Sequence, residues 1–234
     1  MSLLQNLHRS LPGYRLRQSI RRAVCVLPGT SRYPLVTEHT FLPPARLKAL
    51  EQHVAYIERQ RIPGVVVECG VAAGGSAAVL GMALDRWASK RALYLFDTFE
   101  GLPAPSENDP DYDRAVQWTG QCRGTLEDVQ ALFKRLRMTT DRLKFVQGLF
   151  QNTVPQTETG GIALAHLDGD WYESTLTCLK AVWPRLTVGG VLQLDDYGTW
   201  QGCRTATDEF FAGLQSSISM ARIDDSAIVL RRLQ

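Results

Sequence analysis

The chain has 234 residues, of which 44% are hydrophobic and 21% are charged, and its formal net charge at pH 7 is +2. This length suits one large α/β domain, and so small a net charge gives no reason to expect a nucleic acid as partner. No membrane-spanning apolar run, signal peptide or paired-cysteine pattern is evident, so we expect a cytoplasmic protein.

Basic residues dominate the start of the chain. Residues 1–32 contain six arginines and no carboxylate, with leucines between the arginines. A basic amphipathic arm can contact a membrane or an acidic substrate. We favour a helical extension that packs on the domain or on a partner subunit. We therefore divide the chain into an N-terminal arm, residues 1–42, and a main domain, residues 43–234.

Stretches with helical and strand character alternate through the main domain. In chain order the sequence predicts a helix over 43–61, a strand over 65–69, a helix over 76–89, a strand over 92–97, a helix over 126–136, strands over 144–147 and 162–168, a helix over 174–182, a strand over 190–195, a helix over 204–214 and a last strand over 227–231. This order predicts an α/β fold, a mostly parallel sheet with helices on both faces. Ligands of such a sheet lie beyond the carboxyl ends of its strands.

Residues 98–124 interrupt this alternation. The segment is rich in proline, glycine and acidic residues, and it is long for an irregular connection inside a compact domain. We predict that it forms a lid that closes on the substrate.

The first predicted strand ends in an acid and is followed by a glycine-rich turn. Glu68 closes the strand, and Gly70, Gly74 and Gly75 lead into the helix that starts at Ser76. Glycine lets the backbone approach a ligand closely, and free N–H groups at a helix start attract a carboxylate. Glu68 can accept an ammonium group or organise the turn. The methionine end of S-adenosylmethionine carries both a carboxylate and an ammonium group.

A second acid, Asp97, ends the second predicted strand. An acid at this position can accept both hydroxyls of a ribose, as it does in dinucleotide-binding folds. These two features leave NAD open as a ligand. The spacing of Gly70, Gly74 and Gly75 differs from the G-x-G-x-x-G fingerprint, however, and so counts against a dehydrogenase.

Carboxylates also gather at the ends of the fourth and fifth predicted strands. Asp168 and Asp170 follow the fourth strand, and Asp195 and Asp196 follow the fifth. Such like charges repel in a partly dry cleft, and a hard divalent cation relieves the repulsion. Oxygen ligands of this kind fit Mg²⁺, with Mn²⁺ or Ca²⁺ as substitutes, and the cation would acidify a substrate hydroxyl. The alternative, that Asp168 and Asp196 cap helices, leaves the other two acids unexplained.

Five stretches form a specific combination over more than half of the chain. They are Glu68-Cys-Gly-Val-Ala-Ala-Gly-Gly-Ser76, Phe96-Asp-Thr-Phe-Glu-Gly-Leu-Pro103, Gln147-Gly-Leu-Phe150, Leu167-Asp-Gly-Asp-Trp-Tyr-Glu-Ser-Thr175 and Asp195-Asp-Tyr-Gly198. Together they resemble the macrocin O-methyltransferase family, which includes the mycinamicin and novobiocin sugar O-methyltransferases. The resemblance implies the class I methyltransferase fold, which is Rossmann-like with a seven-stranded sheet, and S-adenosylmethionine as the methyl donor. It also implies Mg²⁺ bound by Asp168, Asp195 and Asp196, with Asp168 as the general base.

The resemblance also indicates which residues contact the cofactor. The expected contacts are Glu68, Gly70, Ser76, Asp97, Thr98, Gly148, Phe150 and Asp168. Phe150 is expected to stack on the adenine, with core packing as an equal alternative. The more distant catechol O-methyltransferases have a similar first loop, but they use a lysine base just after the metal aspartate. This chain has Trp171 there, which argues against the catechol mechanism.

We therefore expect a Mg²⁺-dependent O-methyltransferase that methylates a sugar hydroxyl in natural-product, glycolipid or polysaccharide biosynthesis. Its substrate would be a small molecule or an oligosaccharide, and the resemblance implies a homodimer or a larger homo-oligomer. Three alternatives remain: methylation of a small phenol or catechol, a non-catalytic S-adenosylmethionine-binding scaffold, and a metal-independent dehydrogenase.

Overall fold

A computed structural model describes residues 33–214 and 217–234, and the arginine-rich residues 1–32 of the predicted arm lie outside the described residues. One seven-stranded sheet has the order β3-β2-β1-β4-β5-β7-β6. Its strands are β1 (Val65–Cys69), β2 (Leu93–Asp97), β3 (Leu143–Gln147), β4 (Ile162–Leu167), β5 (Leu186–Leu194), β6 (Ile218–Arg222) and β7 (Ile228–Arg232). Strands β1 to β5 are parallel, and β7 runs antiparallel to its neighbours β5 and β6. The mostly parallel α/β sheet is thus confirmed.

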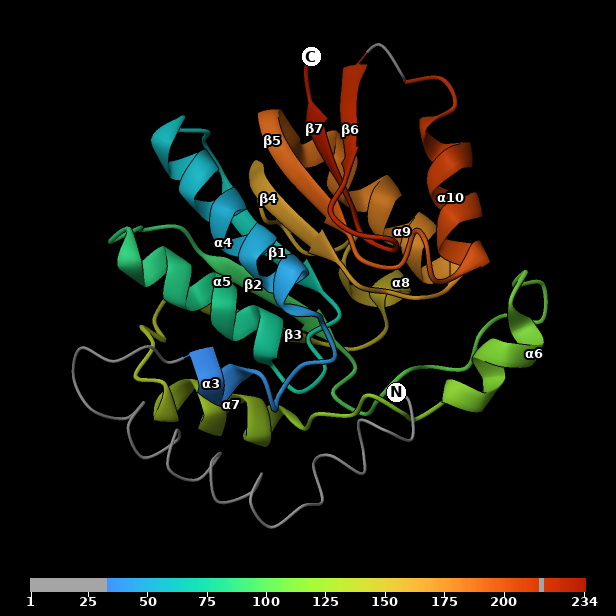
Figure 1. Ribbon diagram of the computed structural model, residues 1–234, viewed down its shortest axis with the longest axis horizontal. Coiled ribbons are helices and arrows are strands. Elements are labelled where there is room, and N and C mark those ends of the chain that lie inside the picture. The colour runs from blue at the N-terminus through green and yellow to red at the C-terminus, as the bar shows by residue number, and fades with distance from the viewer. Residues whose placement is uncertain (1–32, 215–216) are drawn as a thin grey trace.

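Helices cover both faces of the sheet (Figure 1). One face carries α3 (Tyr33–Val36), α4 (Pro44–Arg59), α5 (Gly75–Arg86) and α7 (Leu126–Arg135). The other face carries α8 (Phe150–Thr153), α9 (Tyr172–Val182), the 3₁₀ turn η2 (Trp183–Arg185) and α10 (Gln201–Phe211). None of the described helices combines the length and the apolarity that crossing a membrane requires.

Successive residues of the central strands pack into two apolar cores on opposite faces of the sheet. Val66 belongs to the core that includes α4 and α5, whereas Val67 belongs to the core that includes α9. This alternation follows from the two-residue period of a strand. Strand β4 is buried along its whole length because helices cover both of its sides. Polar side chains are therefore concentrated beyond the strand ends.

The parallel register brings the ends of β1, β4 and β5 together. Cys69 pairs with Leu167, and Leu167 pairs with Leu194. The ladder continues one step further, because the Asp168 N–H donates to the Cys69 carbonyl at 2.9 Å and the Asp195 N–H donates to the Leu167 carbonyl at 3.0 Å. Asp168 and Asp195 therefore stand side by side at the edge of the sheet.

Some element boundaries differ from the prediction. Strand β5 begins at Leu186, because Gly189 and Gly190 form an irregularity inside the strand where the register against β4 shifts. Strand β6, which the sequence does not predict, is a mostly exposed strand at the end of the sheet and pairs with β7. Helices α9 and α10 begin a few residues earlier than predicted, at Tyr172 and Gln201.

The 98–124 segment is mostly irregular, as the sequence predicts. It contains the short helix α6 (Tyr112–Ala115) and the 3₁₀ turn η1 (Val116–Trp118), which lie at the edge of the molecule near the start of α10 (Figure 1). The two ends of the segment pair with each other, because Leu102 N–H donates to the Gln121 carbonyl at 2.9 Å and Gly120 N–H donates to the Leu102 carbonyl at 2.8 Å. The segment is therefore a closed loop that projects from the strand-end side of the domain.

Candidate active site

A cavity of about 500 Å³ lies beyond the carboxyl ends of the parallel strands. It is lined by most of the residues that the sequence marks for the cofactor or the metal, namely Gly70, Ser76, Asp97, Thr98, Phe150, Asp168, Asp195 and Asp196. Glu68 and Gly148 are not among its lining residues. The structure thus brings the glycine-rich turn, the end of β2 and the acids of β4 and β5 into one site.

The carboxylate of Asp97 ties two loops of the site together. Its Oδ2 accepts the N–H groups of Val71 at 2.7 Å and Ala72 at 2.9 Å, both in the turn after β1. Its Oδ1 accepts the Phe99 N–H at 2.7 Å, in the turn after β2. Asp97 therefore fixes the position of the glycine-rich turn, in addition to lining the cavity.

Glycines allow close contacts around this turn. Gly70 has a φ of 96°, and a Cβ on it would collide with the carbonyl oxygen of Asp168. Gly75 opens α5, and its N–H donates to the His39 carbonyl at 2.9 Å. A Cβ on Gly75 would also collide with that carbonyl. Small residues at these positions let the turn lie against β4 on one side and residues 39–42 on the other.

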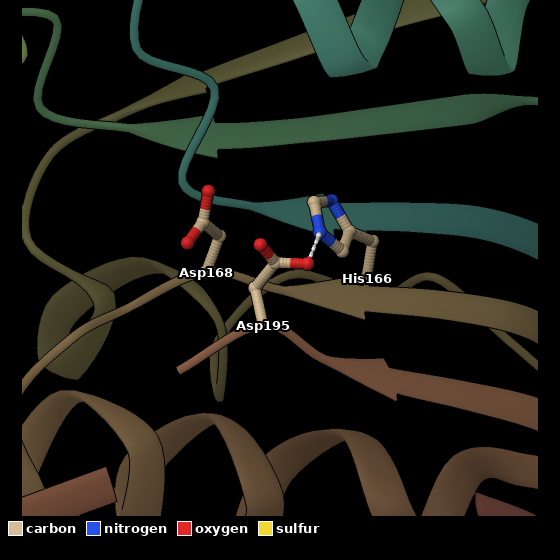
Figure 2. A group of neighbouring side chains, drawn as sticks. All are labelled: His166, Asp168 and Asp195. Atoms are coloured by element: carbon tan, nitrogen blue, oxygen red, sulfur yellow. Dashed lines mark hydrogen bonds and ion pairs between the residues drawn. The ribbon is translucent and has the colours of Figure 1, made fainter. Parts of the chain in front are cut away.

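A buried chain of polar side chains joins the turn to the acids. Glu68 and His166 are fully buried, and Glu68 Oε1 lies 2.8 Å from His166 Nδ1. His166 Nε2 lies 3.2 Å from Asp195 Oδ1, and Figure 2 shows this contact beside Asp168. Burial lowers the pKa of His166, but the hydrogen bonds to Asp195 and Glu68 outweigh it and raise the pKa to about 10. The imidazolium that results can donate to both carboxylates.

Among the residues that the structure describes, three of the four acids in the cluster form no ion pair with a cationic side chain. Burial raises the pKa of Asp168 well above its usual value, and the neighbouring charge of Asp196 raises it further. The pKa of Asp170 is raised by burial and by Asp196. Burial and the charge of Asp195 raise the pKa of Asp196 to about 6. Like charges held together in a buried place cause this pattern, and a cation would relieve it.

Asp195, in contrast, is compensated within the protein. Its Oδ2 forms an ion pair with Arg46 at 2.7 Å, and its Oδ1 accepts the Gln193 side-chain N–H at 3.0 Å. Burial alone would raise the pKa of Asp195, but the contacts with His166 and Arg46 lower it. Arg46 also pairs with Asp224 at 2.7 Å, so it connects α4 and the β6–β7 turn to the site.

The helix-cap alternative for Asp168 and Asp196 does not hold. The residues at the N-cap positions of α9 and α10 are Trp171 and Trp200. Asp196 Oδ2 instead accepts the N–H of Asp170 at 3.2 Å. The side chains of Asp168 and Asp196 contact each other, and both residues line the cavity, so their carboxylates are available to a ligand.

Aromatic side chains from separate elements line the cavity, namely Phe41, Trp118 and Trp200. Trp200 packs edge-to-face on Trp171, with ring centroids 4.8 Å apart, and on Trp118, with centroids 6.4 Å apart. Trp118 belongs to the 98–124 segment, and Phe41 lines the cavity from the chain before α4. The tryptophan indole N–H of Trp171 donates to the Pro103 carbonyl at 2.9 Å. Phe41 and Trp118 are exposed, whereas Trp171 and Trp200 are buried, so the cavity offers two open aromatic side chains as well as the acids.

Sequence reasoning misses two parts of the site. Arg46 contacts Asp195 across 149 positions of sequence. The apolar spacing in its helix, α4, predicts which face of the helix is buried but not this contact. Residues 39–42 line the cavity although they fall in the predicted arm. No local sequence signal identifies either part, because both depend on how α4 packs on the sheet.

A family model described as macrocin-O-methyltransferase (TylF) matches residues 29–232. The 8-demethyl-8-(2,3-dimethoxy-alpha-L-rhamnosyl)-tetracenomycin-C 4'-O-methyltransferase of Streptomyces olivaceus is 32% identical over 197 residues, which cover 82% of this chain and 75% of that protein. The mycinamicin III 3''-O-methyltransferase of Micromonospora griseorubida is 30% identical over 206 residues, which cover 86% of this chain and 80% of that protein. The solved structure of the O-methyltransferase NovP matches with a TM-score of 0.79 at 25% identity, and the match covers 93% of this chain and all of NovP.

The similarity extends over nearly the whole described chain. The residues that the family model matches include both the glycine-rich turn and the acid cluster, and the match to NovP covers 93% of this chain. The motifs that the sequence analysis singles out therefore lie within the matched residues, and the fold is the one that the resemblance implies. The chain belongs to the macrocin-O-methyltransferase family and is an S-adenosylmethionine-dependent O-methyltransferase.

Proposed function

We propose that this enzyme transfers the methyl group of S-adenosylmethionine to a sugar hydroxyl with the help of Mg²⁺. The observation that carries the proposal is the position of the acid cluster. Asp168, Asp195 and Asp196 line the same cavity as Gly70 and Ser76 of the glycine-rich turn. The methyl donor and the group that activates the acceptor would thus meet in one cavity.

The cofactor would lie along the ends of β1, β2 and β3. We assign its methionine part to the turn at Gly70 and to the start of α5 at Ser76, where helix N–H groups favour a carboxylate. Asp97 and Thr98 would face the ribose, and Phe150 would stack on the adenine. Gly148 and Glu68 would act from behind the cavity wall, Glu68 through its contact with His166.

The acid cluster suits a divalent cation. One oxygen each of Asp168 and Asp195 and a ring nitrogen of His166 lie within 4.8 Å of one another. An imidazolium that donates both of its N–H groups has no lone pair for a cation, whereas a carboxylate oxygen that accepts a hydrogen bond keeps a second lone pair, so the aspartate oxygens are the better ligand atoms. The raised pKa values of Asp168 and Asp196 also support a missing positive charge. We assign Asp168, Asp195 and Asp196 to Mg²⁺, for which Mn²⁺ or Ca²⁺ could substitute.

The reaction then needs a base and a fixed geometry. Bound Mg²⁺ would lower the pKa of the acceptor hydroxyl. The Asp168 carboxylate would take the hydroxyl proton. The hydroxyl oxygen would form a bond to the methyl carbon while the bond between that carbon and sulfur breaks. The electron pair of the broken bond would stay on sulfur, which gives S-adenosylhomocysteine. Arg46 and His166 hold Asp195 in place during this step.

The exposed aromatic side chains of the cavity support a sugar acceptor. Phe41 is 59% exposed and Trp118 is 37% exposed, and both line the cavity, so both rings are accessible to a ligand. Such faces suit the apolar side of a sugar ring. The two curated relatives are named for a rhamnosyl tetracenomycin and for mycinamicin III as substrates. We infer a glycosylated small molecule or an oligosaccharide as acceptor, in natural-product, glycolipid or polysaccharide biosynthesis.

We further propose that the enzyme is cytoplasmic and that it assembles as a homodimer or a larger homo-oligomer. Light scattering during size-exclusion chromatography tests the assembly, and a single monomeric species at working concentration would refute it.

Calorimetric titration and turnover test the proposed reaction. The wild type is titrated with S-adenosylmethionine, with and without Mg²⁺, and release of S-adenosylhomocysteine is followed with a panel of sugars, glycosides and catechols. The double variant Asp195→Ala/Asp196→Ala should lose at least about 100-fold in kcat because it lacks two of the three proposed ligands. EDTA should abolish turnover of the wild type.

A matched control is the double variant Glu127→Ala/Asp128→Ala. It removes the same charge from two adjacent acids that are exposed on α7, outside the cavity. Its turnover should equal that of the wild type. Turnover that persists in EDTA and in the Asp195→Ala/Asp196→Ala enzyme would remove the metal from the mechanism. Preference for catechols over every sugar would replace the proposed acceptor.

A further inference from the structure

Two aspartates of the 98–124 segment reach the starts of the helices that follow the site acids. Helix α9 starts just after Asp170, and α10 starts shortly after Asp196. We infer that Asp109 and Asp111 are positioning residues for the two acid-bearing loops, residues 168–171 and 195–200. The inference rests on the proposed function in so far as these loops carry the proposed metal ligands and base.

Asp109 lies where the starts of α9 and α10 meet. Its side chain is buried, with the residue only 6% exposed. Oδ2 accepts the N–H of Tyr172, the first residue of α9, at 2.8 Å, and Oδ1 accepts the Asp111 N–H at 2.9 Å. Gly202 of α10 leaves room for this carboxylate, since a Cβ there would lie 2.8 Å from Asp109 Oδ2. A buried carboxylate with both oxygens in use is therefore fitted between the helices.

Asp111 binds the second helix. Its Oδ2 accepts the N–H of Gly202, in the first turn of α10, at 3.0 Å, and its Oδ1 lies 3.3 Å from Arg114. Arg114 donates to the Thr199 carbonyl at 2.6 Å and lies over the Trp200 ring, 3.8 Å from its centroid. The segment therefore contacts both the helix start and the loop that leads to it.

Neither α9 nor α10 has a side-chain cap of its own. Trp171 and Trp200 occupy the N-cap positions, and an indole has no acceptor atom for the free N–H groups of a helix start. A carboxylate at such a start bonds an N–H group and also interacts favourably with the helix dipole. In contrast, α7 has the usual local cap, Thr125. The 98–124 segment therefore supplies from a distance the caps that α9 and α10 lack.

The capped helix starts are joined directly to the acids. The Trp171 N–H donates to the Gly169 carbonyl at 2.6 Å, and the Trp200 N–H donates to the Asp196 carbonyl at 2.9 Å. The rings of Trp171 and Trp200 pack on each other. A shift of either helix start would therefore move the backbone that bears Asp168 or Asp196. The segment that lines the acceptor side of the cavity thus also sets the geometry of the acids.

Alanine and asparagine variants separate the capping role from other effects. Asparagine keeps an acceptor oxygen and caps helices about as well as aspartate, whereas alanine removes the acceptor. We would measure hydrogen exchange of peptides that cover 168–175 and 195–204, and the kcat and the KM for S-adenosylmethionine. Asp109→Ala and Asp111→Ala should exchange faster in these peptides and lose about tenfold in kcat, with that KM unchanged within about twofold. Asp111→Asn keeps an acceptor for the Gly202 N–H and should recover most of both losses. Asp109→Asn has one acceptor oxygen for two N–H groups, those of Tyr172 and Asp111, so it should recover only part of them.

Two further variants serve as controls. Asp113→Ala removes an equal charge from the same segment, and Thr125→Ala removes the cap of α7. In both variants, hydrogen exchange in the two acid-bearing loops should proceed at the wild-type rate. The inference is wrong if Asp109→Ala and Asp111→Ala exchange there no faster than Asp113→Ala, or if the asparagine variants fail as fully as the alanine variants. Lack of turnover in the wild type would instead refute the proposed function, and the hydrogen-exchange rates would still test whether Asp109 and Asp111 cap α9 and α10.

Discussion

At the scale of single residues, Asp97 combines two roles. Its position at the end of β2 predicts contact with the ribose of a nucleoside. The structure adds an internal role, because its carboxylate accepts N–H groups of Val71, Ala72 and Phe99 from two loops. An acid that organises the loops around a ligand can affect binding even where it makes no contact with that ligand. Its loss should therefore affect both stability and cofactor affinity.

The variant Asp97→Asn tests this dual role. An amide has one acceptor oxygen, so its NH₂ group would face the N–H donors of one loop. We expect the free energy of unfolding to fall by about 1–3 kcal/mol and the affinity for S-adenosylmethionine to weaken about tenfold. Urea unfolding and calorimetry measure the two effects. Asp85→Asn is the control, because Asp85 also accepts a backbone N–H, that of Thr139, but lies outside the cavity.

The control separates stability from binding. Asp85→Asn should lose stability and keep the affinity for the cofactor. If Asp97→Asn binds the cofactor as tightly as Asp85→Asn does, then the loops do not need Asp97 for binding, and its role is confined to stability.

At the scale of elements, the 98–124 segment should respond to ligands. It lines the cavity with Leu102, Trp118 and Cys122, so a bound acceptor would contact it. We predict that it closes as a lid, which should slow tryptic cleavage after Arg114 and Arg123 when cofactor and acceptor are both bound. Cleavage after Arg61, which follows α4 outside the cavity, gives the reference rate. Equal cleavage after Arg114 and Arg123 with and without ligands would contradict the lid.

The elements also show which parts of a fold can be predicted from sequence. Strands β1 to β4 follow the prediction within one residue at each end. Apolar runs in the covered part of the sheet account for β1, β2 and β4, whereas β3 lies at the edge of the sheet and is only partly buried. Strand β6 escapes prediction because most of its residues are exposed and its pairing with β7 determines its conformation. The paired Gly189 and Gly190 predict a strand boundary, but the sheet accommodates them as an irregularity within β5.

At the scale of the whole molecule, the topology explains why the site is only partly predictable. The acids and the glycine-rich turn are recognisable because a parallel sheet brings every strand end to one edge. Arg46, by comparison, contacts Asp195 only because α4 packs over β4 and β5. Glu68 and His166 meet across 98 positions through the pairing of β1 with β4. Contacts of this kind follow from the fold and have no signature in the local sequence.

Burial of His53 predicts how the stability of the whole domain depends on pH. His53 lies on the buried face of α4. Burial lowers its pKa, the charges of Arg231 and His166 lower it further, and the contact with Gln193 opposes them, which gives a pKa of about 4 against 6.5 in an unfolded chain. Above pH 6.5 neither state binds the proton. As the pH falls from there toward 4, the unfolded chain binds a proton that the folded chain excludes, so stability is lost.

The variant His53→Gln removes this titration and isolates its effect. The other groups titrate in both proteins, so the difference between them reports on His53 alone. Between pH 7 and pH 4.5 we expect the wild type to lose about 2 kcal/mol more of its free energy of unfolding than the variant does. Urea unfolding at the two pH values measures this difference. Parallel losses in both proteins would mean that His53 binds its proton in the folded state as readily as in the unfolded chain, and that α4 opens to water without unfolding of the domain.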